Sequence, residues 1–383
     1  MKFSTHIINL FYLVLLFSNC VQEFNPPSQG YENVLVIEAF LTDGEEAFEV
    51  KLSRSIPIDT SGFIPEPGAA VSLSDDSGEK FILVESSEPG VYFSQGKINP
   101  QIGKSYQIHV QTKNGNQYES ASVRMRNTPE IDSISFKYEE RPSAGLKGVQ
   151  IFINTHDPAN ETWYYRWEWD ESWMFRTPYD SYLIWEEGEI KIRDERVHTC
   201  WKFGRSTSIE IATTKNLNTD RVNEYPLNYV ATNTDRLQIK YSINVKQYSL
   251  SEESYNYWLE LQKATESLGS LFDPQPSIIY GNIFNINDAS ELVLGYFDAS
   301  SVREQRIYVT GKDIPPTRFP NNFSHCIDSI VSPGMVAEMV DDLWWLVEET
   351  TNEVTGFPAF LMSSLQCIDC TIYGTNKKPD YWD

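Results

Sequence analysis

Four cysteines in the second half of the chain have the clearest chemical potential. They are Cys200, Cys326, Cys367 and Cys370, and the last two form a Cys-x-x-Cys pair. Such a pair can carry redox chemistry or half of a zinc site, but no second pair and no thioredoxin-like context accompany it. The N-terminus carries an apolar run that is typical of an export signal. An even number of cysteines in an exported chain favours structural disulfides over a metal site built from all four thiolates. The pairing stays open among three possibilities.

A fifth cysteine, Cys20, follows an apolar run from Ile7 to Phe17. This run is too short to span a bilayer as a helix and is typical of the core of a secretory signal. The residues around Cys20 resemble the lipobox of bacterial lipoproteins. The resemblance implies a signal peptide over 1–19, a diacylglycerol on the Cys20 thiol and a lipidated tether over 20–33. Buried acyl chains anchor such a protein at about 0.8 kcal/mol per methylene. The alternative is a secreted protein with an incidental cysteine.

Aromatic residues crowd the stretch from Trp163 to Trp185. On a strand, Trp163, Tyr165, Trp167 and Trp169 would share one face, which favours the core. The later rings are spaced less regularly, between charges and a proline. Exposed rings bury a large area at little entropic cost, so they predict a ligand or partner surface. This surface would comprise Trp173, Phe175, Tyr179, Tyr182 and Trp185.

Carboxylates near these rings suggest an alternative function. Two acids that flank a sugar can hydrolyse it, and Glu168, Asp170, Glu186 and Glu187 lie in this stretch. They would make the protein a lipid-anchored hydrolase of glycan or peptide. The sequence contains no His-Glu-x-x-His, no Gly-x-Ser-x-Gly and no phosphate-binding glycine loop. We therefore predict a protein that is not an enzyme, with no catalytic residues, no metal and no cofactor.

The elements that carry these residues are mainly β. Seven short runs with apolar or alternating character lie between Val34 and Met125, and turn signals such as Asn114-Gly115 separate them. They predict an immunoglobulin-like β-sandwich over 34–127. The runs are Val34–Leu41, Ala47–Ser53, Ala69–Ser74, Lys80–Glu85, Val91–Ser94, Ser105–Thr112 and Tyr118–Arg124.

A larger β-rich domain is predicted over 128–383, with one or two inserted helices and the disulfides. Ser251 can cap a helix over 251–268, whose first turn carries Glu252 and Glu253. Ser332-Pro333 resembles a second helix start. The residues after it fit helical spacing, but Trp344 to Val347 fits a strand equally well.

The charge of the chain excludes one class of partner. The 383 residues include 31 basic and 54 acidic side chains, a net charge of −23. A chain this acidic repels phosphate backbones, so nucleic-acid binding is not expected. Apolar residues make up 40% of the chain, which is enough to exclude wholesale disorder.

Several short strings, in this order along the chain, resemble one family. They include Val36–Thr42, Val50–Arg54, Pro67–Val71, Gly103–Tyr106, Pro129–Asp132, Tyr164–Trp167, Gly281–Ile283, Val293–Phe297, Cys367–Cys370 and Pro379–Trp382. The family is that of uncharacterised Bacteroidota-type outer-membrane lipoproteins, usually encoded beside TonB-dependent receptors. The resemblance implies outer-membrane lipid bound through acylated Cys20 and a receptor barrel as partner. We expect a non-enzymatic accessory component, which captures a nutrient ligand or forms a lid on the barrel. The membrane face stays open.

Overall fold

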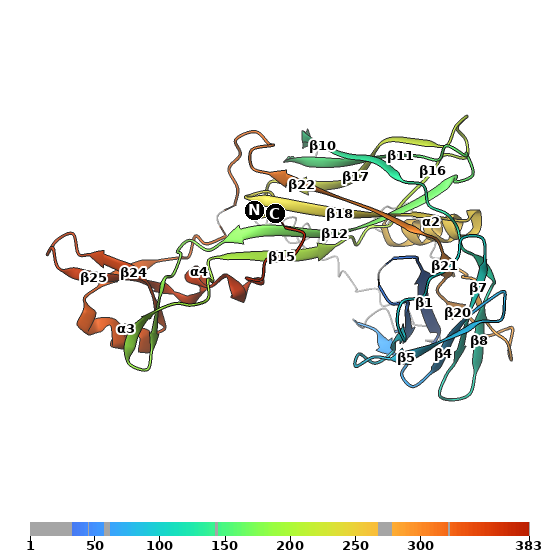
Figure 1. Cartoon of the computed structure of the whole chain (residues 1–383), viewed down its shortest axis with the longest axis horizontal. Helices are drawn as coiled ribbons and strands as arrows, with labels where there is room; N and C mark the ends of the chain where they lie inside the picture. Colours follow the sequence, from blue (N-terminus) through green and yellow to red (C-terminus); the bar gives the residue numbers. More distant parts are fainter. Residues whose placement is uncertain are drawn as a thin grey trace, which may run out of the picture.

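The computed structural model describes residues 33–44, 46–56, 62–141, 145–266, 278–320 and 322–382. The predicted signal peptide, Cys20 and all of the predicted tether except Asn33 lie outside these residues. The chain is mainly β, as predicted, with several sheets and few helices (Figure 1). Among the described residues, no helix has the length and apolar character needed to cross a membrane.

The predicted N-terminal strands all form. They are β1 (Leu35–Leu41), β2 (Glu49–Arg54), β4 (Ala70–Asp75), β5 (Lys80–Glu85), β6 (Val91–Ser94), β7 (Ser105–Gln111), β8 (Gln117–Ser120) and β9 (Val123–Arg124). A short β3 (Ile64–Pro65) pairs with β2. Pairing runs without a break through β7, β4, β5, β6, β2 and β1, so these strands belong to one sheet. The two-sheet sandwich is therefore not confirmed by the hydrogen bonding.

Three later strands complete this N-terminal sheet. β19 (Ile283–Asn285) pairs with β8, whereas β20 (Val293–Leu294) and β21 (Phe297–Ala299) run parallel to β1. The backbone between β20 and β21 lies very close to the backbone of β1. A Cβ added to Gly295, whose φ is +104°, would lie 1.9 Å from the Ile37 carbonyl oxygen. The N-terminal sheet thus combines strands from residues 35–124 with three strands from residues 283–299.

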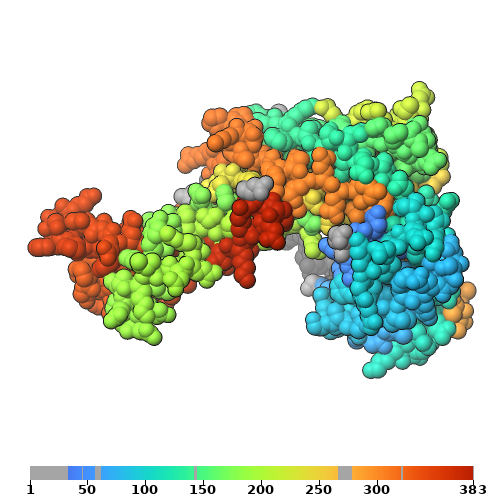
Figure 2. All heavy atoms as spheres, in the orientation of Figure 1, coloured from blue at the N-terminus to red at the C-terminus, as the bar shows by residue number. Residues whose placement is uncertain are grey.

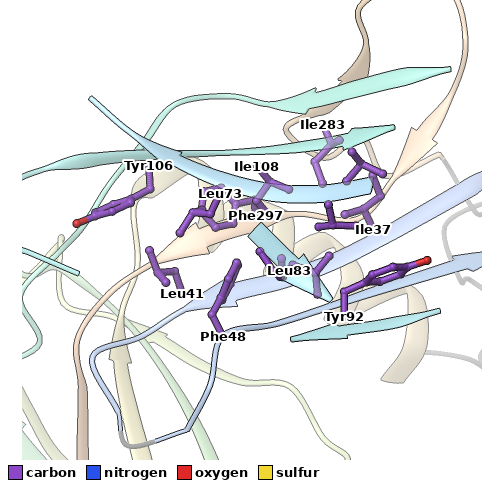
Figure 3. Packing of buried hydrophobic residues seen from close by; sticks show 14 of the residues in the cluster. Ile37, Leu41, Phe48, Leu73, Leu83, Tyr92, Tyr106, Ile108, Ile283 and Phe297 are labelled. Atoms are coloured by element: carbon purple, nitrogen blue, oxygen red, sulfur yellow. The ribbon is translucent and has the colours of Figure 1, made fainter. Parts of the chain in front are cut away.

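Alternation along the strands builds the core of this sheet (Figure 3). Leu35, Ile37, Ala39 and Leu41 are buried on one face of β1. Strands β4 and β7 supply further aliphatic residues, and Phe297 of the returning β21 is fully buried among them. Apolar area removed from water stabilises this unit by about 25 cal/mol per Å².

Two further sheets form the centre of the molecule. One contains β10 (Ile131–Arg141), β11 (Leu146–His156) and β17 (Arg221–Ala231). The other contains β12 (Tyr164–Arg176), β15 (Thr199–Arg205), β16 (Glu210–Thr213), β18 (Lys240–Ser249) and β22 (Val302–Thr310). They share one hydrophobic core and lie as two layers in Figure 1.

The helix predicted over 251–268 is α2 (Glu252–Glu266). The Ser251 hydroxyl accepts a hydrogen bond from the Ser254 amide at 3.0 Å, which satisfies a backbone donor that the first turn leaves free. Trp258 of this helix stacks on the Arg166 guanidinium of β12, 3.8 Å from the ring centre. Cation–π contact therefore fixes α2 against the central sheet.

Most of the remaining elements form a projection that we call the arm, residues 181–193 and 327–364, and the short helices α4 (Leu365–Ile368) and η3 (Cys370–Ile372) follow it. It contains the hairpin β13 (Leu183–Glu186) and β14 (Glu189–Ile192), and a sheet of β23 (Asp328–Val331), β25 (Pro358–Ser364) and β24 (Trp344–Thr351). The second predicted helix is present as the turn η2 (Pro333–Met335) followed by α3 (Val336–Asp341), and Trp344–Val347 is strand. The arm extends to the left of the central sheets, away from the N-terminal sheet (Figures 1 and 2).

Candidate interaction surface

The aromatic strand β12 is mainly a core element. Tyr165, Trp167 and Trp169 are buried, as their alternation predicts. Trp173 and Phe175 are also buried, at 8% and 2% exposure. The prediction of an interaction surface is therefore wrong for these two residues, because the strand continues to Arg176 and keeps them on the covered side of the sheet.

One carboxylate on the buried face of β12 escaped the sequence reasoning. Glu171 is 5% exposed and accepts a hydrogen bond from the Tyr241 hydroxyl at 2.9 Å. Its second partner is Arg236, at 3.2 Å. Burial and the nearby Glu171 charge raise the pKa of Tyr241. Glu171 is thus a buried carboxylate whose partners, a buried tyrosine and a partly exposed arginine, satisfy it, and this arrangement serves packing rather than chemistry.

The carboxylates of the hydrolase alternative are held in ion pairs on two separate elements. Asp170 on β12 lies 3.1 Å from Lys246, and Glu168 contacts Arg166 on the same strand. Glu186 and Glu187 belong to the β13–β14 turn of the arm and share Lys191, at 3.2 and 2.7 Å. The structure therefore does not place the two acids of β12 and the two acids of the hairpin on one element, and each of the four carboxylates is paired with a lysine or an arginine.

Both disulfides form at the base of the arm. Cys326 pairs with Cys367, which joins the two ends of the segment that carries β23, α3, β24 and β25. Cys200 of β15 pairs with Cys370, three residues after Cys367. The Cys-x-x-Cys pair therefore ties the closed arm to the central sheet. His325 lies beside Cys326 and Cys367, but a disulfide leaves neither sulfur as a thiolate ligand.

The other three predicted rings lie at the base of the arm and within it. Tyr179 is half-buried, and burial near the Asp328 carboxylate raises its pKa. Tyr182 is 42% exposed and holds the Arg196 guanidinium 4.1 Å from its ring centre. Trp185 packs on the core of the arm. Of the five predicted rings, Tyr182 is the most exposed.

The arm sheet buries one face and leaves apolar residues on the other. On the buried face Val331 pairs with Phe360, and Leu346 with Met362; α3 and the β13–β14 hairpin supply residues that cover it. On the opposite face Ile330 and Glu348 flank Leu361 across the three strands. Ile330 is 44% exposed, so this face presents an apolar row beside carboxylates.

Further large apolar side chains are exposed around the arm. Val354, at 94%, is the most exposed of those in the described part of the chain, and Phe357 is 70% exposed. Both belong to the turn between β24 and β25. Ile192, Leu343, Ile327 and Met335 are also exposed. Exposed apolar patches on a folded protein mark sites that another surface covers.

The arm carries Lys191 and Arg193 in its hairpin segment, but the charge of its second segment is one-sided. From residue 319 to residue 376 the sequence contains no lysine and no arginine, whereas it contains eight acidic residues. They are Asp328, Glu338, Asp341, Asp342, Glu348, Glu349, Glu353 and Asp369. The exposed apolar residues of the arm sheet therefore stand on an acidic background.

Two open clefts lie away from the arm. One, of about 540 Å³, is lined by Arg54, Glu66 and Lys113 at the end of the N-terminal sheet. Arg54 is neutralised there by Glu66, 2.6 Å away. The other, of about 380 Å³, is lined by Tyr138, Lys147 and other polar residues. None of the predicted surface rings lines either cleft. The arm, which carries Tyr182 and the exposed apolar residues, is the candidate interaction surface.

Comparison with known proteins gives a family but no activity. None of the curated proteins compared with the chain matches it. A family model described as a domain of unknown function, DUF4249, matches residues 21–306, which is most of the chain. The match includes the N-terminal sheet, the β13–β14 hairpin and the central sheets as far as the middle of β22, and it ends before β23. The chain therefore belongs to the DUF4249 family of domains of unknown function.

Proposed function

We propose that this protein is a non-enzymatic lipoprotein of the outer membrane, anchored through acylated Cys20, which works as an accessory or lid component of a TonB-dependent receptor. The single observation that carries the proposal is the arm. It projects from the central sheets (Figure 1). Its segment 327–364 exposes apolar residues among carboxylates and contains no lysine or arginine. A surface of this kind supports association with another protein.

The construction of the arm supports a contact role. Its core contains few buried residues, and two disulfides secure its base. Disulfides stabilise a segment whose own core is small, mainly by constraining its unfolded state. The exposed side chains can therefore serve a partner without being needed for the stability of the arm.

The proposal is tested by purification of the tagged full-length protein from outer membranes solubilised in mild detergent. We expect a TonB-dependent barrel to copurify in near-stoichiometric amount, and radiolabelled palmitate to enter the protein. Cys20→Ser should abolish the label and release the protein from the membrane fraction. Recovery of the protein without a barrel under several growth conditions would contradict the receptor role. Protease treatment of intact cells then shows which membrane face carries the arm.

A further inference from the structure

The turn at the distal end of the arm is ordered by its own hydrogen bonds. The Asn352 amide donates to the Phe357 carbonyl at 3.0 Å, and the Gly356 amide donates to the Asn352 carbonyl at 2.7 Å. The Asn352 side-chain oxygen accepts from the amides of Val354 and Thr355, at 3.0 and 3.1 Å. Gly356 has a φ of +71°, which few residues besides glycine adopt readily.

This ordered turn exposes its two apolar side chains. Val354 and Phe357 are 94% and 70% exposed, although residues of this size are usually at least partly covered. The turn is thus organised before any partner binds. Pre-organisation reduces the entropy that a contact must lose on binding, and rigid aromatic side chains that fill pockets dominate binding energy.

We infer that Val354 and Phe357 enter an apolar pocket of the partner protein, and that lysine and arginine residues rim this pocket. The inference rests on the proposed function and specifies which part of the arm makes the contact. We infer the basic rim from charge complementarity with the carboxylates near the turn. Glu348, Glu349 and Glu353 are exposed beside the turn, and the sequence has no cation from residue 319 to residue 376 to offset them.

The same charges argue against two other occupants. A second copy of this chain would bring an equally acidic arm and a net charge of −23, and like charges across an interface cost affinity. An anionic lipid surface would repel the turn for the same reason. A basic protein pocket is the occupant that satisfies both the apolar side chains and the carboxylates.

The first test measures affinity for the purified receptor barrel in detergent micelles. Val354→Ser with Phe357→Ser should weaken the Kd about tenfold or more. The matched control is Ile82→Ser with Val84→Ser, which removes two exposed apolar residues from β5 of the N-terminal sheet. The control should change the Kd by less than about twofold. Unchanged affinity of the turn variant for a barrel that the parent binds would overturn the inference and leave the proposed function intact.

A second variant tests the rim. Glu348→Gln, Glu349→Gln and Glu353→Gln together should slow association and flatten its dependence on salt, because long-range attraction acts mainly on the rate of encounter. An association rate that rises with salt, or does not respond to the three substitutions, would contradict a basic rim.

Photo-cross-linking separates this inference from the receptor proposal. A benzoylphenylalanine at position 357 of the full-length protein in intact cells should attach to a protein, and the cross-linked peptide should carry lysine or arginine near the site. If the parent binds no barrel, the receptor role fails, whereas a cross-link to another basic protein still supports the pocket. Cross-linking to a second copy would overturn the inference. So would binding of the Cys20→Ser protein, which lacks the acyl anchor, to phosphatidylcholine or phosphatidylglycerol vesicles.

Discussion

The N-terminal sheet and the arm reach stability by different means. Among the described residues, the sheet gathers 21 buried apolar residues into one cluster, whereas the core of the arm has five. The arm instead has a disulfide that joins the two ends of its 327–364 segment and a second that fixes this segment to β15. Buried apolar area thus stabilises the sheet, whereas disulfides stabilise the arm. Because its stability depends less on burial, the arm can expose apolar residues.

The largest effect is expected at the closest contact in the N-terminal sheet. Gly295→Ala would force a Cβ against the Ile37 carbonyl at a φ of +104°. We expect the free energy of unfolding to fall by about 3 kcal/mol, from backbone strain and displacement of β20. Chemical denaturation measures this. Gly96→Ala is the control, because φ is +117° there and nothing lies within 4 Å. Equal effects of the two substitutions would mean that the contact itself contributes nothing.

The arm should respond most strongly to loss of its own disulfide. Cys326→Ser with Cys367→Ser should lower the stability of the arm by about 2 kcal/mol, because the unfolded segment regains its freedom. Hydrogen exchange should accelerate in β23, β24 and β25 and stay unchanged in β1, β4 and β7. Equal acceleration in both regions would show that the two units are not independently stabilised.

Acidification offers a smaller, reversible perturbation near the base of the arm. Burial lowers the pKa of His198, which lies opposite Thr177, below its usual 6.5. The folded state therefore favours the neutral imidazole. Its contribution to stability is complete above pH 6.5 and is lost as the pH falls from 6.5 through the folded pKa. Between pH 7.5 and 5.5 the parent should lose more stability than His198→Gln. Parallel pH curves for the two proteins would exclude this histidine as a source of acid sensitivity.

The smallest effect on stability is expected at the tip of the arm. Phe357→Ser should change the free energy of unfolding by no more than about 0.5 kcal/mol, because the exposed ring has few contacts to lose. Thermal unfolding of this variant should be compared with that of Phe360→Ser, which removes a buried ring from the core of the arm. A large loss at Phe357 would show that the ring supports the arm rather than a partner.

The sequence predicts those parts of the fold that depend on local pattern. Apolar and alternating runs located the N-terminal strands β1, β2 and β4 to β7, but not the short β3. A capping serine with acidic residues after it located α2. Tyr165, Trp167 and Trp169 were likewise assigned to the core from their spacing. The same rule, applied beyond Trp169, would have placed Trp173 and Phe175 there too, since both continue the period of two on one long strand.

The features that escaped prediction depend on distant pairings. Nothing in the sequence near Phe297 shows that it runs beside β1, and four cysteines alone do not select one of three pairings. Of the five rings predicted to form a surface, only Tyr182 is exposed on the arm, whereas Trp185 packs on the core of the arm. The strongest sequence signal of the arm surface is the absence of lysine and arginine over 319–376, which a charge count by segment would have detected.

The return of β19, β20 and β21 also fixes an order of events during synthesis. A chain that emerges from its N-terminus displays β1 and β8 long before residues 283–299 arrive to cover their edges. Uncovered strand edges recruit foreign strands and aggregate. The first third of this protein therefore exposes two strand edges until more than three-quarters of the polypeptide has emerged. Chaperones that cover these edges during that interval would reduce aggregation.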